Sequence, residues 1–252
     1  MCTLVILRRP GHAWPLILAA NRDEMLDRPW KSPARHWPDR EHVVAGLDQL
    51  AGGTWLALND DGVVAGVLNR PDSLGSAPEM RSRGELPLEA VDHAEACGAA
   101  AALGHLEAAN YRPFNMVVAD AIDAFWLRAE RGTAHRADGI EAWSVPDELS
   151  MITAYDLNDP ASPRISRYRS QFETARAPDP ETGDWSEWQT LLAARGTVDE
   201  SLNAMNVSEP DGFSTISSSL IALPAVDRFG VRPVWLFAAG PPDRAPYEPV
   251  EL

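Results

Sequence analysis

The second residue of the chain brings together the two groups that nucleophilic catalysis needs. Cys2 follows Met1 and opens the apolar run Thr3–Leu7. If Met1 is removed, Cys2 carries both a thiol and a free α-amine. An amine with a pKa of about 7.7–8.0 can accept the thiol proton near neutral pH and so release the nucleophilic thiolate. Cys2 is therefore the candidate nucleophile, although its position alone favours a simpler interpretation, a small residue at the start of a strand.

Four consecutive polar residues end the next apolar run and form a candidate site. They are Asn21, Arg22, Asp23 and Glu24. Side chains alternate along a strand, so Asn21 and Asp23 are expected on one face and Arg22 and Glu24 on the other. Burying such groups is costly unless they bond to each other or to a ligand. The alternative is an ion-pair cluster at the surface.

The remaining titratable residues indicate neither metal nor redox chemistry. Cys97 is the only other cysteine, and it does not form a C-x-x-C pair with Cys2. It lies in an Ala-rich run that predicts a buried, inert helix position. The six histidines lack the spacing of a metal site. We therefore expect no metal and no cofactor, and we disfavour a thiol-redox protein.

Composition restricts the partners. The 252 residues carry a formal charge of −15, from 22 basic and 37 acidic side chains, which argues against nucleic acid or an anionic membrane surface. Neither a signal-peptide pattern nor an apolar run long enough for a membrane helix is apparent, so a cytoplasmic location without a membrane span is the expectation. A single domain, residues 1–252, is predicted.

Short apolar runs predict strands at both ends of the sequence and helices in its middle. Asp-Gly and Asp-rich links at 60–62 and 120–123 predict two antiparallel hairpins. Runs of strands around a helical block favour an α+β fold. The strands expected are 3–7, 16–21, 42–47, 53–59, 63–68, 115–119, 124–128, 218–223 and 234–238, and the helices are 88–109, 165–174, 185–195 and 199–206.

Six segments, taken together and in order, resemble the NRDE family, that of the transport and Golgi organisation protein 2. This resemblance implies a branch of the N-terminal nucleophile hydrolases, with a four-layer αββα sandwich of mainly antiparallel sheets. Cysteine members of that class include conjugated bile-salt hydrolases and penicillin V acylases, which cleave a non-peptide amide through an acyl-thioester. The segments are Met1-Cys2-Thr3-Leu4, Ala20-Asn21-Arg22-Asp23-Glu24, Ala51-Gly52-Gly53-Thr54-Trp55-Leu56, Ser82-Arg83-Gly84-Glu85-Leu86, Phe114-Asn115-Met116 and Phe213-Ser214-Thr215-Ile216-Ser217-Ser218-Ser219.

The resemblance also implies roles for individual residues. Cys2 matches the nucleophile and Asp23 the acidic residue of the amidases, whereas Ala20 replaces their arginine. The hairpin Asn59–Asn69 is similar to theirs, which makes Asn69 the candidate oxyanion donor; a plain hairpin end is the alternative.

Four further residues are predicted to bind substrate: Asn21, Arg22, Glu24 and Ser217. Among them, Arg22 is the candidate for holding a substrate carboxylate. Ser217 is included because it matches the family's serine cluster.

Two interpretations of function follow. The first is a cysteine amidohydrolase acting on a carbon–nitrogen bond other than a peptide bond, with Cys2 as nucleophile. The second is a binding or trafficking protein for haem, acyl-CoA or another lipid-like ligand, since a fold alone does not determine function. Ala154 favours the second, because the family pattern has an asparagine there. Asn158 could replace it only if the loop turns back.

Overall fold

The computed structural model describes residues 2–75, 77, 79–130 and 139–252, and Met1 lies outside this part. The chain divides into two compact units, each described by itself below: unit 1 comprises residues 1–28 and 146–251, and unit 2 comprises residues 29–145 with Leu252. The single-domain assignment of 1–252 stays a prediction. None of the helices in the described residues combines the length and apolar character needed to cross a membrane.

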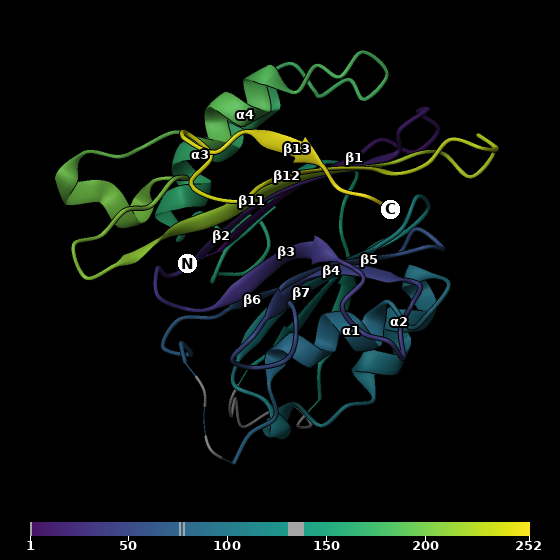
Figure 1. Cartoon of the computed structure of the whole chain (residues 1–252), viewed down its shortest axis with the longest axis horizontal. Helices are drawn as coiled ribbons and strands as arrows, with labels where there is room; N and C mark the ends of the chain where they lie inside the picture. Colours follow the sequence, from purple (N-terminus) through teal and green to yellow (C-terminus); the bar gives the residue numbers. More distant parts are fainter. Residues whose placement is uncertain (1, 76, 78, 131–138) are drawn as a thin grey trace. The chain divides into compact units, whose positions relative to one another are not determined.

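Unit 1 is built on a six-stranded antiparallel sheet in the order β10-β1-β2-β11-β12-β13. The helices α3 and α4 cover one of its faces (Figure 1). The elements are β1 (Thr3–Arg8), β2 (Leu16–Met25), β10 (Glu148–Ile152), α3 (Pro163–Thr174), α4 (Ser186–Leu192), the 3-10 helix η3 (Val198–Asn203), β11 (Phe213–Leu223), β12 (Val234–Ala238) and β13 (Tyr247–Pro249).

Alternating apolar side chains explain why this sheet has one face packed by helices. Val5 and Leu7 of β1 and Ile17 and Ala19 of β2 are buried against the helical layer, two residues apart on each strand. Helix α3 begins at Pro163, where the missing N–H costs nothing, and the Ser162 side chain caps it by accepting from the Ile165 N–H.

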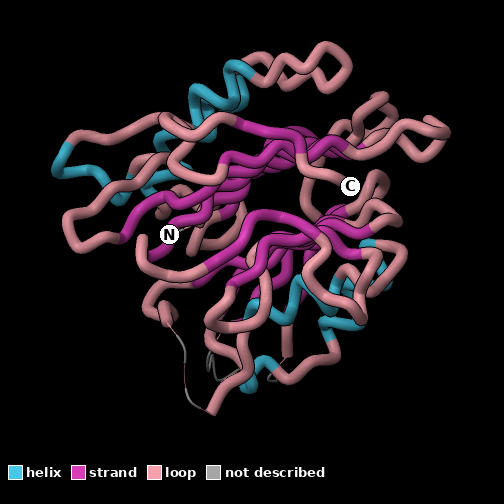
Figure 2. The backbone as a smooth tube through the Cα atoms, viewed as in Figure 1, coloured by secondary structure: helices cyan, strands magenta, loops and turns pink. Residues whose placement is uncertain are grey.

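Unit 2 is built on a seven-stranded antiparallel sheet in the order β3-β4-β5-β6-β7-β8-β9. Figure 2 shows strands in magenta and helices in cyan along the backbone. Both hairpins predicted from the Asp-rich links are confirmed as β5–β6 and β7–β8. The elements are β3 (Trp30–Ala34), β4 (Val43–Asp48), β5 (Leu56–Asn59), β6 (Val64–Asn69), η1 (Arg83–Glu85), α1 (Leu86–Ala90), α2 (Ala96–Gly104), η2 (Ala108–Asn110), β7 (Phe114–Ala119), β8 (Ala124–Ala129) and β9 (Glu141–Ser144).

Two glycine-containing segments of unit 2 touch through their backbones. The Thr54 N–H donates to the Gly84 carbonyl at 2.8 Å. A Cβ atom added to Gly53 would lie 2.4 Å from the Gly84 carbonyl carbon and oxygen, closer than any side chain tolerates. Glycine is therefore required sterically at this approach.

The single helix predicted over residues 88–109 is wrong. The structure has α1, α2 and η2 in its place. The Asn59 side chain donates to the carbonyls of Val91 and His93, each at 2.8 Å. In a continuous helix these carbonyls would accept from N–H groups four residues on, so Asn59 holds the chain open between α1 and α2.

Cys97 is exposed, and its predicted burial was wrong. The buried stripe of α2 runs through Ala96, Ala99, Ala100 and Leu103, the spacing of one helix face. Cys97 falls outside that stripe.

Other elements differ in extent from the prediction. β2 continues to Met25, so the polar run Asn21–Glu24 lies within the strand instead of after it. β11 begins at Phe213 and α4 ends at Leu192, whereas 199–206 is mainly the short 3-10 helix η3. The short strands β3, β9, β10 and β13 were not predicted.

Candidate active site

The predicted site residues of unit 1 are divided between the two faces of its sheet. Antiparallel pairing sets Thr3 opposite Asn21, and Asn21 opposite Ser218. The side chains of Asn21 and Asp23 both contact groups of the helical layer, which confirms that they share a face. By alternation, Arg22 and Glu24 lie on the other face.

The face that carries α3 and α4 holds a set of mutually bonded polar side chains, here called the buried polar layer. Its centre is an ion pair in which Arg164 Nη1 lies 3.0 Å from Asp23 Oδ2, with side chains 2% and 0% exposed. The same Arg164 nitrogen donates to Thr3 at 2.6 Å, and Asp23 Oδ1 accepts from Thr215 at 2.6 Å. The layer comprises Thr3, Asn21, Asp23, Arg164, Thr215 and Ser218.

Asn21 is fully engaged with the protein. Its amide group donates to the carbonyls of Leu192 at 3.0 Å and Met205 at 2.8 Å, and its oxygen accepts from Ser218 at 2.7 Å. These bonds join β2 to α4, to the segment after η3 and to β11. The geometry therefore makes Asn21 a residue that holds strands together, and its predicted contact with substrate stays a prediction.

A β-bulge in β11 makes this layer possible. Thr215 pairs with Asp23 and Ser217 pairs with Arg22, so Ile216 is the extra residue. Thr215 and Ser218 consequently point to the same face although they are three residues apart. The serine and threonine run of β11 thus serves both faces of the sheet.

The opposite face carries the candidate nucleophile. Continuing the β1–β2 register by one residue sets Cys2 opposite Arg22. Continuing the β1–β10 register by two residues sets Cys2 opposite Ala154, beyond the end of β10. Ser217 lies beside Arg22 on β11. We call Ala154, Cys2, Arg22 and Ser217 the Cys2 row. It places three of the predicted site residues side by side across three strands.

Cys2 is half-buried, and its thiol donates to the backbone carbonyl of Asp23 at 3.7 Å. Burial of the sulfur raises the pKa of Cys2, the charge of Asp23 raises it further and Arg22 lowers it. A thiol with a raised pKa stays protonated at neutral pH, so its activation requires a nearby base.

Asn158 does not supply the amide that Ala154 lacks. The loop after β10 turns back, as one prediction required, and Asn158 adopts a left-handed conformation with a φ of 60°. Its side chain, however, accepts from the Met151 N–H at 2.8 Å and donates to Ser150 at 3.1 Å. Both polar ends are therefore used along β10, away from Ala154.

Two predicted residues are not members of the Cys2 row. Glu24 is half-exposed and forms an ion pair with Arg28 at 3.6 Å. Asn69 ends β6 in unit 2 and lies opposite Phe114. Val67 packs against the unit 2 core, so alternation places Asn69 on that same face. Its role as oxyanion donor stays a prediction.

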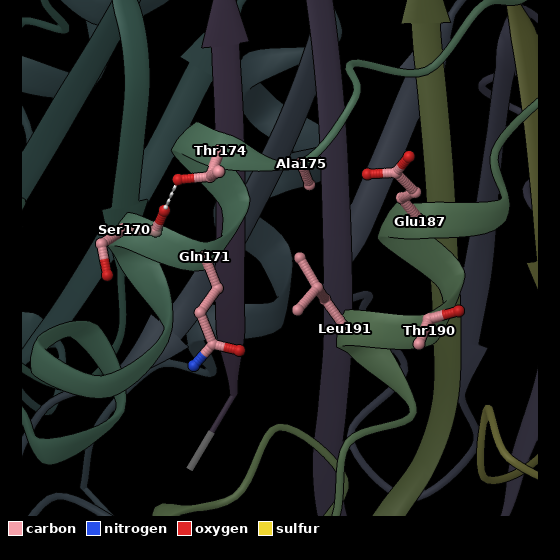
Figure 3. Close-up of a pocket in the computed structure, with 7 residues that line it drawn as sticks. All are labelled: Ser170, Gln171, Thr174, Ala175, Glu187, Thr190 and Leu191. Atoms are coloured by element: carbon pink, nitrogen blue, oxygen red, sulfur yellow. Dashed lines mark hydrogen bonds between the residues drawn. The ribbon is translucent and has the colours of Figure 1, made fainter.

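A separate pocket lies between α3 and α4 on unit 1, with a volume of about 550 Å³ (Figure 3). Leu191 and Ala175 contribute apolar surface, and Glu187 is held by the Arg176 N–H at 2.7 Å. None of the predicted site residues lines this pocket. Within the described ranges, no cluster of three or more His, Cys, Asp or Glu side chains could hold a metal ion.

Arg164 and Thr215 were missed as site residues by the sequence predictions. A signal for Arg164 was present: it shares a spacing of four residues with the buried Tyr168 and Phe172 of α3. An arginine on an apolar helix stripe requires a buried acidic partner. The identity of that partner, Asp23, could not be read from the stripe.

Known structures identify the class of fold. An N-acylethanolamine-hydrolyzing acid amidase ortholog of Caenorhabditis elegans aligns with a TM-score of 0.56 and 12% identity, over 90% of this chain and 94% of that one. A variant of the conjugated bile acid hydrolase of Clostridium perfringens aligns with a TM-score of 0.57 and 10% identity, over 100% of this chain and 97% of that one. The fold is therefore of the N-terminal nucleophile hydrolase type, with two antiparallel sheets and a few helices, which confirms the predicted α+β class.

The family model for Transport and Golgi organisation 2 matches residues 1–232. The chain belongs to this family. Transport and Golgi organization 2 homologs of Mus musculus and Bos taurus are 35% and 36% identical, over 43% and 48% of this chain and 40% and 42% of their own lengths. The chain thus spans about two fifths of the length of these relatives.

Proposed function

We propose that this protein is a cysteine amidohydrolase that cleaves a carbon–nitrogen bond other than a peptide bond in a small-molecule amide. The observation that carries the proposal is the position of Cys2, half-buried beside the β2 strand end and in one row with Arg22 and Ser217. The two structural relatives are named as an amidase and a bile acid hydrolase, which supports the reaction class.

The proposed reaction proceeds in two steps. With Met1 removed, the α-amine of Cys2 accepts the thiol proton and the thiolate attacks the substrate carbonyl. The amine group of the substrate leaves with that proton, and an acyl-thioester forms on Cys2. Water then attacks the thioester with the α-amine as base, releasing the acid and restoring the thiol.

The remaining residues have supporting roles in this proposal. Arg22 lies in the Cys2 row and binds a carboxylate of the substrate. Asp23 acts through its place in the buried polar layer, since its carboxylate is held by Arg164 and Thr215 and its backbone carbonyl accepts the Cys2 thiol. Asn69 remains the predicted oxyanion donor, and loss of a single donor of this kind lowers kcat by about 10²–10³-fold.

The test compares the two cysteines. Purified wild-type protein, Cys2→Ala and Cys97→Ala are treated with a panel of N-acyl amides, and hydrolysis and acyl adducts are measured. The proposal predicts turnover in wild type and Cys97→Ala and none in Cys2→Ala. Turnover that survives in Cys2→Ala would exclude this mechanism.

A second function is favoured by one observation. Ala154 occupies the end of the Cys2 row where the family pattern has asparagine, and Asn158 is bonded elsewhere. A protein that binds an acyl, haem-like or other lipid-like ligand without cleaving it needs no such amide. It would bind that ligand equally well as Cys2→Ala, and no covalent adduct would form.

A further inference from the structure

The C-terminal segment, residues 239–250, lies beyond the part of the chain that matches the family. It adds β13 to the edge of β12 and is tied to the sheet by a bond from the Val250 N–H to the Trp235 carbonyl at 2.8 Å. Two of its side chains, Asp243 and Tyr247, form hydrogen bonds with residues outside β12 and β13.

Asp243 holds the segment that follows η3. Its carboxylate accepts two bonds from Arg195 at 2.8 and 3.0 Å and one from Asn206 at 2.7 Å. Asn206 is 2% exposed and is further fixed by a bond from its N–H to the Ala194 carbonyl. The residues on each side of it, Met205 and Val207, are also buried.

Met205 and Val207 contact the buried polar layer directly. The Met205 carbonyl accepts from Asn21 at 2.8 Å, and the Val207 N–H donates to the Thr215 hydroxyl at 2.8 Å. Thr215 in turn donates to Asp23. Asp243 is therefore connected to Asp23 through hydrogen bonds and the peptide link between Asn206 and Val207.

Tyr247 reaches the same layer by a second route. Its hydroxyl donates to Ser218 at 2.7 Å, and Ser218 donates to Asn21 at 2.7 Å. The Ser218 hydroxyl also lies 3.1 Å from the Ala20 carbonyl, so both of its acceptors are on β2. The two routes from the C-terminal segment converge on Asn21 and Asp23.

We propose that the C-terminal segment is a positioning strap, with Asp243 and Tyr247 as positioning residues that hold the Asn21–Asp23 part of β2. Because the Asp23 carbonyl accepts the Cys2 thiol, the strap also sets the surroundings of the candidate nucleophile. This second consequence rests on the proposed function, whereas the strap itself does not.

The test measures hydrogen exchange and thiol reactivity on the full chain. The variants are Tyr247→Phe and Asp243→Asn, with Asp243→Glu as the charge-preserving variant. Glu173→Gln, which removes an exposed ion pair with Arg169 on α3, is the matched control. The reporters for Asp243 are the backbone amides of Asn206, Val207 and Thr215, and those for Tyr247 are the backbone amides of Asn21 and Ser218. The rate at which Cys2 is alkylated at pH 7 is measured for every variant.

Tyr247→Phe and Asp243→Asn are each expected to speed hydrogen exchange at their own reporter amides by about tenfold. The amides of α3 are expected to exchange as in wild type. Asp243→Glu and the control are expected to stay close to wild type. Unchanged exchange at the reporters, or a uniform rise across unit 1, would overturn the strap.

The alkylation rates separate this inference from the proposed function. A several-fold change in Cys2 alkylation in Tyr247→Phe and Asp243→Asn supports the link to the nucleophile. If wild-type Cys2 reacts and its alkylation rate is the same in both variants, the link between the strap and Cys2 is overturned. A wild-type Cys2 that never reacts counts against the proposed function, and the exchange data still decide the strap.

Discussion

The ion pair between Asp23 and Arg164 determines what Asp23 can do. Both side chains are buried, and Arg164 also donates to Thr3 and to the Leu202 carbonyl. Removing one partner of such a pair leaves the other charge buried without compensation, which is far more costly than losing an exposed ion pair. Asp23 is thus held in place by a residue of α3.

We predict that Arg164→Ala lowers the free energy of unfolding by about 3–5 kcal/mol. The double variant with Asp23→Asn should recover part of that loss, because the isolated carboxylate is then removed. Urea unfolding measures both. Arg169→Ala, an exposed position on the same helix, is the control and should change stability by less than about 1 kcal/mol. Equal losses of unfolding free energy in Arg164→Ala and Arg169→Ala would contradict the buried ion pair between Arg164 and Asp23.

The pKa of Cys2 leads to a pH prediction. Burial raises it, so the folded state favours the neutral thiol. The contribution of the neutral Cys2 thiol to the stability of the folded state is complete below the unfolded pKa of about 8.5. It is lost as the pH rises through the higher pKa of the folded state. Protein that retains Met1 should therefore be alkylated at Cys2 slowly at pH 7 and faster above about pH 9. A rate at pH 7 equal to that of a free thiol would contradict this.

At this scale, sequence predicted part of the site. Alternation correctly placed Asn21 and Asp23 on one face, because a strand leaves a side chain little choice of side. It could not show that their face is the one covered by α3 and α4, since Arg164 lies 141 residues further on. The hydrogen bond that joins Asp23 to Cys2 is made by the Asp23 backbone carbonyl, which no residue pattern predicts.

The glycine contact is the clearest feature at the scale of elements. Two of the segments that resemble the family, those around Gly53 and Gly84, are far apart in sequence but touch in unit 2. Their glycines have a steric explanation that needs no catalytic role.

Gly53→Ala is expected to destabilise the protein by about 1–3 kcal/mol or more, because the new methyl group meets the Gly84 backbone. Gly98→Ala is the control, at an exposed position of α2 where the nearest atom to the new methyl group is 3.9 Å away. It should stabilise by up to about 1 kcal/mol through helix propensity. Thermal unfolding of both variants would show opposite shifts, and a neutral Gly53→Ala would refute the contact.

Asp243 makes the stability of the contacts of the C-terminal segment depend on pH. Bonds from Arg195 and then Asn206 lower its pKa, and Arg244 lies 3.8 Å away. The contribution to stability is present above the unfolded pKa of about 3.9 and is lost as the pH falls through the lower folded value. Exchange at Asn206 should therefore accelerate in this acidic range in wild type but not in Asp243→Asn. Identical pH profiles would contradict this.

Hairpins and long apolar strands were predictable because their signals are local. The break between α1 and α2 was not, since the Asn59 side chain that causes it comes from β5. Short strands such as β10 were also missed, because their pairing partner is distant in sequence: β1 for β10. Tertiary contacts override local propensity in both cases.

At the scale of the whole molecule, unit 1 is assembled from two separate parts of the chain. Residues 1–28 supply β1 and β2, and residues 146–251 supply their neighbours β10 and β11. The second part therefore supplies Ala154 and Ser217 to the Cys2 row, whereas the first part supplies Cys2 and Arg22. Local patterns predicted an α+β fold, and the family resemblance added the N-terminal nucleophile hydrolase type.

The assignment of Cys2 as the nucleophile is tested by the intact mass of the purified wild-type protein before and after treatment with an electrophilic acyl probe, followed by peptide mapping. The wild-type protein is expected to lack Met1 and to carry a single acyl adduct on Cys2, and Cys2→Ala is expected to carry no adduct at that position. Retained Met1, or a Cys2 that stays unlabelled while Cys97 reacts, would contradict the assignment of Cys2 as the nucleophile.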